Sequence, residues 1–548
     1  MAELNGGQIA ALQLRAAGID TVFGVVAGPM IEVFAGAQEA GLKVVNCRHE
    51  ENAGFMASAW GYVKGKPGVV IAGSGPGMTN TVTPMHVATA SAMPLVVLGG
   101  STYARHRGIG GFQECDQMAF AAPGCKQTFQ VDSTERIAEL VYLALGKSAA
   151  GRPGAIYVDF PGNFVAQRID ESRARLREHA PEVTRAFPDP NGIDRIAEML
   201  AGAKSPLIIV GKGAAWANGS AALTRLVNLG IPYISSPMAR GVIDDDNPYF
   251  MNGARGMALR GADAIVMIGG RFNWIFSMGR ASRLHPDVRL AQIDIEPEEM
   301  FNGSNLAIGI VADAAVAAEQ LAQALSTRRL NQATEQWLAV LRAKRDENAA
   351  ASEAVMASDA SPIDPHRLVR DVRDVLPRNA SIAVDGEVIM GICRTLLPSF
   401  GARSRLNAGT TGCMGTGAPY AIGAALAAPD RPSVAVLGDY AFGAAAMSIE
   451  TAMRVGAKAV FVVSNNEGIA GHGIQDRMMP PNSPRIASLL PANYEKMAEM
   501  VDGHAERVED PADIKPALER ALASDRISLV HVRTDPKASR LGGASYLG

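Results

Sequence analysis

The sequence predicts an α/β protein with three consecutive parallel-sheet domains. Short runs rich in β-branched residues alternate with helical stretches along the whole chain, which is typical of parallel βαβ units. Glycine-rich turns follow many of these runs, and the 57 glycines among 548 residues exceed the usual share of about 7%. At roughly 150 residues a domain, the length allows three to four domains, and the order of the motifs favours three.

Composition excludes several classes of protein. Hydrophobic residues make up 48% and charged residues 20%, so the chain is not disordered. A net charge of −3 gives no global basic surface for nucleic acid. Five widely spaced cysteines without a Cys-x-x-Cys pair indicate a reducing compartment. With no signal-peptide pattern and no apolar run of about 18 residues, we expect a cytoplasmic protein with no membrane or nucleic-acid partner.

The first domain is expected over residues 1–170. A helix is expected from Glu51 to about Val63, between the second and third strands. The expected strands of this domain are 21–24, 43–46, 68–71, 95–98 and 155–160.

A second domain is expected over 188–327, with strands at 207–210, 264–268 and 289–295. Residues 328–360 are polar, charged and alanine-rich, which predicts a helix feeding a linker. The third domain is expected over 361–548, and its strands are 381–384, 433–437, 459–463 and 529–532.

Polar residues follow two strands of the third domain. Gly438 and Asp439 come after one strand, and Asn466 comes after the next. Open α/β sheets bind ligands at the carboxyl ends of their strands, and carboxylate and amide oxygens are ligands that Mg²⁺ prefers. The glycine-rich turn would supply N–H groups to a phosphate. The alternative is that Asp439 only caps a helix.

The first domain holds a second candidate site. Glu50 and Glu51 begin the expected helix, and the glycine-rich loop 73–80 follows the next strand. The alternative for Glu50 is that its charge only stabilises the start of a helix.

Together these motifs resemble thiamine-diphosphate-dependent enzymes of the acetolactate synthase and decarboxylase type, over essentially the whole chain. The matching segments are CRHEENAGFMASAWGYVKGKPGVVIAGSGPGMTN, GCMGTGAPYAIGAALA, GDYAFG and NNEG. The resemblance implies a pyrimidine-binding domain, a central nucleotide-binding domain and a diphosphate-binding domain, in that order. It also implies thiamine diphosphate and Mg²⁺ as cofactors, and a homo-oligomer, a dimer of dimers, with active sites between subunits.

The resemblance assigns roles to single residues. Glu50 would hydrogen-bond the cofactor's pyrimidine, and Met414 would support the cofactor's bent conformation, although Met414 also suits an ordinary core. Asp439, Asn466 and the carbonyl of Gly468 would hold Mg²⁺. The other expected cofactor-binding residues are Gly28, Asn80, Gln113, Gly386, Glu387, Gly412, Gly438, Tyr440, Ala441 and Ile469.

The central segments RGMALRGADAIVMIGGR and GGRFNWIFSMGR, with GGFQECDQMAF, look like the oxalyl-CoA decarboxylase and 2-hydroxyacyl-CoA lyase branch. That branch carries ADP in its central domain as a structural or regulatory ligand. The candidate ADP residues, each of which is otherwise a surface ion pair, are Arg152, Lys212, Arg271, Asp294 and Asp313.

Within the branch, Phe112-Gln113 and Ala470 stand where oxalyl-CoA decarboxylases carry tyrosines. We therefore favour a 2-hydroxyacyl-CoA lyase, which cleaves the C1–C2 bond reversibly to formyl-CoA and an aldehyde or ketone. The alternatives are an oxalyl-CoA decarboxylase and an acetolactate-synthase-like carboligase.

The expected catalytic residues are Glu50, Gln113, Glu467 and His472, although His472 also suits a surface loop. Arg403, Arg405 and Arg540 are the candidates for CoA, whose phosphates need basic contacts. The glycine-rich, basic C-terminal tail is expected to close over CoA as a lid; a frayed tail is the alternative.

Overall fold

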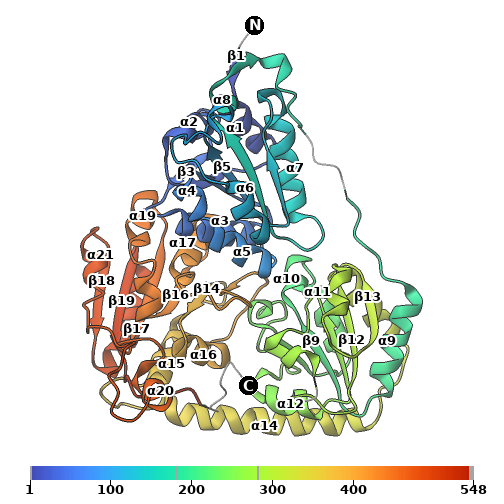
Figure 1. The fold of residues 1–548 in the computed structure, drawn as a ribbon. Coiled ribbons are helices and arrows are strands. Elements are labelled where there is room, and N and C mark those ends of the chain that lie inside the picture. The colour runs from blue at the N-terminus through green and yellow to red at the C-terminus, as the bar shows by residue number, and fades with distance from the viewer. Residues whose placement is uncertain (1–2, 179–182, 281–282, 542–548) are drawn as a thin grey trace. The chain divides into compact units, whose positions relative to one another are not determined.

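The computed structural model describes residues 3–178, 183–280 and 283–541. Contacts divide the chain into two compact units. The first unit contains Met1–Val183, Thr411–Ser433 and Ala444–Ala459. The second contains Thr184–Thr410, Val434–Gly443 and Val460–Gly548. Within the described residues, the strands form three parallel sheets and one small antiparallel pair, β1 (Glu3–Asn5) with β8 (Arg168–Asp170) (Figure 1).

The first sheet has the strand order β3-β2-β4-β5-β7-β6 and is parallel. Each strand that the sequence predicts here is present. The strands are β2 (Thr21–Gly24), β3 (Lys43–Asn46), β4 (Gly68–Ala72), β5 (Leu95–Ser101), β6 (Gln127–Gln130) and β7 (Ala155–Pro161). The principal helices are α1 (Gly6–Ala16), α2 (Ile31–Glu39), α3 (Glu50–Lys64), α5 (Val82–Ala90) and α7 (Ile137–Ala149).

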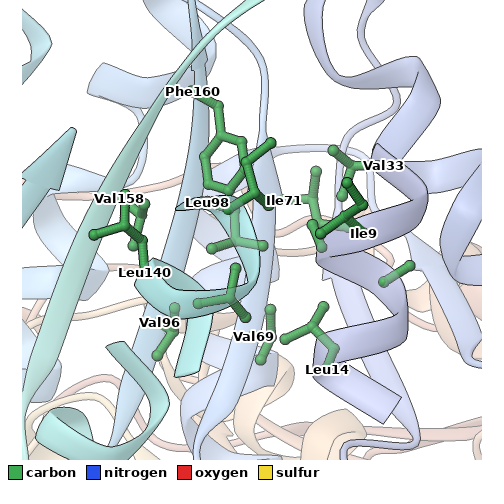
Figure 2. Packing of buried hydrophobic residues seen from close by; sticks show 14 of the residues in the cluster. Ile9, Leu14, Val33, Val69, Ile71, Val96, Leu98, Leu140, Val158 and Phe160 are labelled. Atoms are coloured by element: carbon green, nitrogen blue, oxygen red, sulfur yellow. The ribbon is translucent and has the colours of Figure 1, made fainter. Parts of the chain in front are cut away.

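The core of this sheet is apolar on the face that α1, α2 and α7 cover (Figure 2). Alternate residues of the central strands, such as Val69 and Ile71 of β4, point into it, because strand side chains alternate between faces. Ile9 and Leu14 of α1 are fully buried against them. Parallel strands covered by helices are buried on both faces, which explains why β4 and β5 read as continuous apolar runs.

The second sheet has the order β10-β9-β11-β12-β13 and is also parallel. Its strands are β9 (Pro206–Val210), β10 (Tyr233–Ser235), β11 (Ala264–Ile268), β12 (Arg289–Asp294) and β13 (Leu306–Val311). The principal helices are α9 (Pro190–Gly202), α10 (Lys212–Trp216), α11 (Ser220–Val227), α12 (Arg255–Gly261) and α13 (Ala314–Ser326). The strands β10 and β13 escape sequence prediction, since β10 is short and β13 alternates buried with exposed residues.

The third sheet has the order β15-β14-β16-β17-β19-β18. Its strands are β14 (Ser381–Asp385), β15 (Arg405–Leu406), β16 (Ser433–Gly438), β17 (Ala459–Asn465), β18 (His504–Val508) and β19 (Ser528–Arg533). Its principal helices are α15 (Pro365–Val375), α16 (Val388–Leu396), α18 (Asp439–Gly443), α20 (Gly471–Met478), α21 (Lys496–Glu499) and α22 (Ile514–Ala523). Two further helices, α17 (Gly417–Ala427) and α19 (Ser448–Val455), belong to the first unit.

Most of the expected linker is one long helix, α14 (Ala333–Met356), at the base of Figure 1. Leu338 and Leu341 anchor it in the core of the second sheet. No helix in the described part of the chain is long and apolar enough to cross a membrane.

Candidate active site

Each sheet reverses its strand order after its second strand, at β2/β4, β9/β11 and β14/β16, and a glycine lies there in close contact with the neighbouring strand end. A Cβ on Gly24 would lie 2.0 Å from the carbonyl oxygen of Ile71, and one on Gly211 would lie 2.2 Å from that of Gly269. In the third sheet, a Cβ on Gly386 would lie 3.1 Å from the backbone nitrogen of Gly438. Doubly wound sheets bind ligands at such points, so the glycine-rich turns mark three candidate ligand edges.

The first edge carries Glu50, the first residue of α3. The amide nitrogen of Asn80, on the glycine loop, donates a hydrogen bond to Glu50 Oε2 at 3.0 Å. A Cβ on Gly77 would lie 3.3 Å from Glu50 Oε1, so the loop passes close to the carboxylate. Both Glu50 and Asn80 are half-buried, which leaves the carboxylate oriented and within reach of a ligand.

Gln113 and Gln117 accept hydrogen bonds from the glycine loop. The Ser74 hydroxyl donates to Oε1 of Gln113, and the Gly75 N–H donates to Oε1 of Gln117, both at 2.7 Å. Gly75 has φ +56°, and a Cβ there would lie 2.6 Å from the Gln113 carbonyl oxygen, so a glycine is required. Gln117 also donates to Asp159 Oδ1 at 3.2 Å, which ties the loop to a buried carboxylate.

The segment with Gly412 and Met414 lies in the same unit. It leads into α17, and α17 packs along α3, side by side in Figure 1. Gly423 allows this contact, because a Cβ there would lie 2.2 Å from the Met56 carbonyl oxygen. Met414 is 39% exposed and Gly28 is also exposed, so both are accessible to a ligand. Core packing therefore does not account for Met414.

The second unit holds the candidate metal centre. Asp439 follows β16 and is 1% exposed. Its Oδ1 accepts the N–H of Tyr440 at 2.8 Å, and its Oδ2 accepts the N–H of Gly468 at 3.0 Å. Burial raises the pKa of Asp439 from 3.8 to about 6, against these backbone hydrogen bonds. A buried carboxylate with a raised pKa at a strand end is typical of a binding site.

Asn466 completes this centre. One terminal atom of its amide lies 3.2 Å from Asp439 Oδ1 and 2.9 Å from the Gly468 carbonyl oxygen. With nitrogen in that position the amide bridges both acceptors; with oxygen there, three oxygens converge. One carboxylate, one amide and one carbonyl are a donor set that fits Mg²⁺, which takes few protein ligands and completes its octahedron with water and phosphate oxygens.

The other predicted cofactor residues of this unit lie at the same edge. Gly386 and Glu387 follow β14, beside Gly438 at the end of β16. Tyr440 and Ala441 follow Asp439 in the first turn of α18. Ile469 lies in the turn after β17, where its N–H donates to the Ala487 carbonyl.

Glu467 and His472 surround the end of β17. Glu467 has φ +62°, and its Oε1 accepts a hydrogen bond from Arg533 Nη2 at 2.9 Å. His472 lies in the first turn of α20, and its N–H donates to the Pro536 carbonyl. A Cβ on Gly471 would lie 2.7 Å from the same oxygen, so residues that lead into the C-terminal tail pack tightly on α20.

Four of the candidate ADP residues lie at the carboxyl edge of the second sheet. Lys212 begins α10 after β9, and Asp294 ends β12. Arg271 pairs with Glu299 at 2.9 Å, and Asp313 caps α13 while it pairs with Arg185 at 3.4 Å. Arg152 lies in the first unit and donates to the Ala90 carbonyl.

An arginine-lined cavity of about 170 Å³ lies within the second unit. Its lining comes from the loop after β10, the start of α12, the 3₁₀ turn 274–279, the end of α16 and the C-terminal segment. Within the described residues the lining includes no carboxylate, and its members are Ser235, Pro237, Arg240, Asn252, Arg255, Trp274, Ile275, Arg283, Arg394, Thr395 and Arg540.

The cavity is strongly positive. Burial, together with the charges of Arg394 and Arg283, lowers the pKa of Arg255 from 12.5 to about 10. Two carboxylates outside the lining offset part of the charge: Asp245 pairs with Arg240 at 2.5 Å, and Glu387 with Arg540 at 2.7 Å. Clustered guanidinium groups of this kind fit a phosphate, and Trp274 and Ile275 add an apolar wall.

Of the three arginines predicted for CoA, only Arg540 lines this cavity. Arg405 is 2% exposed, and its guanidinium donates to the carbonyls of Cys393 and Leu397 at the end of α16. A cation at a helix C-terminus stabilises the helix in this way. The guanidinium of Arg405 is therefore buried against α16 and out of reach of a ligand. Arg403 is half-buried with φ +62°.

Sequence reasoning missed the other four arginines of the cavity. Arg240, Arg255 and Arg283 lie in the segment between β10 and β12, whereas Arg394 lies in the last turn of α16. No local pattern relates them. It also missed His531, for which a signal exists: a histidine inside the apolar strand β19 is fully buried.

Comparison with known proteins agrees with this geometry. The family models of the thiamine pyrophosphate enzymes match in order: the N-terminal TPP binding domain over residues 4–120, the central domain over 193–321 and the C-terminal TPP binding domain over 388–532. The chain therefore belongs to the thiamine pyrophosphate enzyme family, and it is an enzyme that uses thiamine diphosphate.

Three relatives of this chain have been assigned individual names within the family. The chain is 32% identical to 2-hydroxyacyl-CoA lyase 1 of Homo sapiens, over 98% of this chain and 96% of that one. It is 30% identical to oxalyl-CoA decarboxylase of Escherichia coli, over 98% and 96%. It is also 32% identical to the acetolactate synthase large subunit of Mycobacterium tuberculosis, over 98% and 97%.

Proposed function

We propose that this enzyme is a 2-hydroxyacyl-CoA lyase, which cleaves the C1–C2 bond of a 2-hydroxyacyl-CoA to formyl-CoA and an aldehyde or ketone, and runs the reverse condensation. The observation that carries the proposal is the arginine-lined cavity with Arg255 and Arg540. A free 2-keto acid, the substrate of the carboligase alternative, has no phosphate for such a cavity. Coenzyme A carries three, together with an adenine ring that suits the wall of Trp274.

The choice within the CoA branch depends on side-chain size at two positions, Ala470 and Gln113. Ala470 has φ +59° and precedes α20, so the turn that carries Glu467 presents a methyl group at this position. Gln113 lies exposed, with its Oε1 held by Ser74. Two small or amide groups in place of tyrosines favour a substrate larger than an oxalyl group. Oxalyl-CoA decarboxylation is the second candidate, because the arginine cavity suits CoA in either substrate.

The protein's own residues would bind and orient the reactants. Thiamine diphosphate supplies the electron sink that stabilises a carbanion during cleavage of the C–C bond. Glu50, held by Asn80, would accept a hydrogen bond from the cofactor's pyrimidine and handle the proton there. Asp439, Asn466 and Gly468 would hold Mg²⁺ against the diphosphate. His472 and Glu467 would handle the proton of the substrate hydroxyl.

We further infer that the carboxyl edge of the second sheet binds ADP through Lys212 and Asp294, since nucleotides bind at such edges. The enzyme would be a cytoplasmic homo-oligomer, a dimer of dimers. The loop that carries Gln113 supports this, because Ile109 and Phe112 are 75% and 77% exposed, a surface that a second copy would cover.

The test is a side-by-side assay of oxalyl-CoA, several 2-hydroxyacyl-CoAs and pyruvate, with thiamine diphosphate and Mg²⁺ present or withheld. The proposal expects formyl-CoA and an aldehyde from the 2-hydroxyacyl-CoAs only when both cofactors are present. Formyl-CoA from oxalyl-CoA alone would select the decarboxylase, and acetolactate from pyruvate would select the carboligase. The variant Arg255→Met is expected to raise KM for the acyl-CoA while the affinity for thiamine diphosphate stays unchanged.

A further inference from the structure

A chain of buried polar groups lies behind the candidate metal centre. His531, on β19, is 1% exposed, Asn465 at the end of β17 is 2% exposed, and Glu495 before α21 is 5% exposed. Nδ1 of His531 lies 2.7 Å from Glu495 Oε2, and Nε2 lies 3.0 Å from the amide nitrogen of Asn465. Buried polar groups of this kind are costly unless each is satisfied, so the arrangement is specific.

The hydrogen bond between Glu467 and Asn465 determines which group donates in every other hydrogen bond of this buried network. The backbone N–H of Glu467 donates to Asn465 Oδ1 at 3.1 Å, so the carbonyl end of that amide faces Glu467. The NH₂ end therefore faces His531, and Nε2 must accept. The imidazole proton then lies on Nδ1 and is donated to the Glu495 carboxylate. Burial lowers the pKa of His531, which favours this neutral form.

This hydrogen-bonded network ends at the turn after β17, which carries Asn466 and Gly468. Glu467 has φ +62°, a conformation that an L-residue keeps only when its surroundings hold it. Asn466 and Gly468 flank Glu467 in the sequence. One terminal atom of the Asn466 amide lies 3.2 Å from Asp439 Oδ1 and 2.9 Å from the Gly468 carbonyl oxygen. The hydrogen bond from Glu467 to Asn465 therefore fixes the turn on which those oxygens converge.

We infer that His531 is a positioning residue for the metal site: with Glu495 it holds the Asn465 amide in the one orientation that caps Glu467. Without the Glu495 acceptor, the imidazole is free to carry its proton on Nε2. That proton would face the Asn465 NH₂ group, and the amide would turn over. Its NH₂ group would then meet the Glu467 N–H, and the turn would lose its cap. The inference rests on the proposed magnesium site.

The test measures metal affinity directly. Mn²⁺ binding to the holoprotein with saturating thiamine diphosphate is followed by electron paramagnetic resonance, which counts free Mn²⁺. His531→Phe keeps the aromatic packing against Tyr494, whose ring lies edge-on at 5.5 Å, but removes both hydrogen bonds. We expect a loss of Mn²⁺ affinity of about tenfold, the lower end for groups that orient metal ligands, with kcat recovering at saturating metal.

Conservative and control variants separate positioning from general stability. Glu495→Gln keeps an acceptor for Nδ1 and is expected to bind Mn²⁺ like the natural protein, whereas Glu495→Ala is expected to match His531→Phe. His504→Phe is the matched control, because His504 also contacts a glutamate, Glu506 at 3.1 Å, in the same sheet. It should leave Mn²⁺ affinity unchanged.

The outcomes are distinct. Unchanged Mn²⁺ affinity in folded His531→Phe overturns the positioning role. If that variant does not fold, equal affinities of Glu495→Ala and Glu495→Gln overturn it. Asn466→Ala tests the metal site itself: if it binds Mn²⁺ like the natural protein, the proposed metal ligands are wrong, independently of His531.

Discussion

Asn80 holds Glu50: the amide nitrogen of one lies 3.0 Å from a carboxylate oxygen of the other, across the glycine loop that begins one residue after β4. The contact orients the carboxylate without burying it completely. Orientation of this kind is the protein's main contribution when a cofactor supplies the reactive atom.

The first prediction follows from this pair. Glu50→Ala should abolish turnover, because its carboxylate is the group proposed to accept a hydrogen bond from the pyrimidine and to handle the proton there. Asn80→Ala removes one charge-assisted hydrogen bond, about 1.5 kcal/mol, and should lower kcat about tenfold. Steady-state kinetics with saturating cofactor provide the measurement. Full activity of Glu50→Ala would refute its assignment, and Thr79→Ala on the same loop is the control.

The second prediction concerns the loss of folding stability that results from burying the Asp439 carboxylate. Burial raises the pKa of Asp439 from 3.8 to about 6 in the cofactor-free protein. Between these values the unfolded chain binds fewer protons than the folded one, so the free energy of unfolding falls as pH rises from about 4 to 6 and stays lower above that. Two pKa units correspond to about 3 kcal/mol.

Asp439→Asn should therefore raise the Tm of the cofactor-free protein at pH 8, and raise it less at pH 4. The same variant should lose Mg²⁺-dependent binding of thiamine diphosphate. Thermal unfolding at both pH values and calorimetric cofactor titration are the measurements. A variant less stable than the natural protein at pH 8 would contradict the sign of this effect.

The third prediction concerns Gly391 on α16. A Cβ at this position would lie 2.0 Å from Cδ of Arg540, so the arginine reaches Glu387 only across a glycine. Gly391→Ala should displace Arg540 from the cavity and raise KM for the acyl-CoA about fivefold, while Tm holds or rises, since alanine stabilises a helix by about 1 kcal/mol relative to glycine.

Gly146→Ala on α7 is the matched control, because no atom lies within 4 Å of a Cβ there. It should change neither KM nor kcat. Deletion of the chain after Asp535 should raise KM at least as much as Gly391→Ala. An unchanged KM in both variants would exclude a contact between the C-terminal segment and CoA.

The fourth prediction concerns the thiols. The five cysteines, all within the described residues, form no disulfide, and burial raises the pKa of Cys47, Cys125 and Cys393 to about 12. These three should resist alkylation by iodoacetamide at pH 7.5, because the thiolate is the reactive form. Cys413 is half-buried and should react first. Peptide mass mapping of the labelled native protein gives the order, and rapid labelling of Cys47 would contradict the burial.

Much of the candidate site could be predicted because its signals are local. The turns after β3, β16 and β17 carry their polar residues within a few positions of an apolar strand, so Glu50, Asp439 and Asn466 are recognisable in the sequence. Parallel topology then brings strand ends to one edge, which is why Asp439 and Asn466, 27 positions apart, meet in the structure. Arg405 shows the limit: its sequence context resembles an exposed basic turn, whereas its side chain caps α16 from inside the core.

The sequence by itself determined the three parallel sheets, the glycines at their points of reversal and the polar groups at their edges. These depend on periodicity and short-range turn chemistry, which neighbouring residues encode. Only the tertiary structure decided the arginine cavity, the contact between Arg540 and Glu387, and the orientation of His531 toward Asn465. Each of these joins side chains that are far apart in the sequence. Their charges and hydrogen-bonding groups interact strongly only when folding removes water and brings them within a few ångströms of each other.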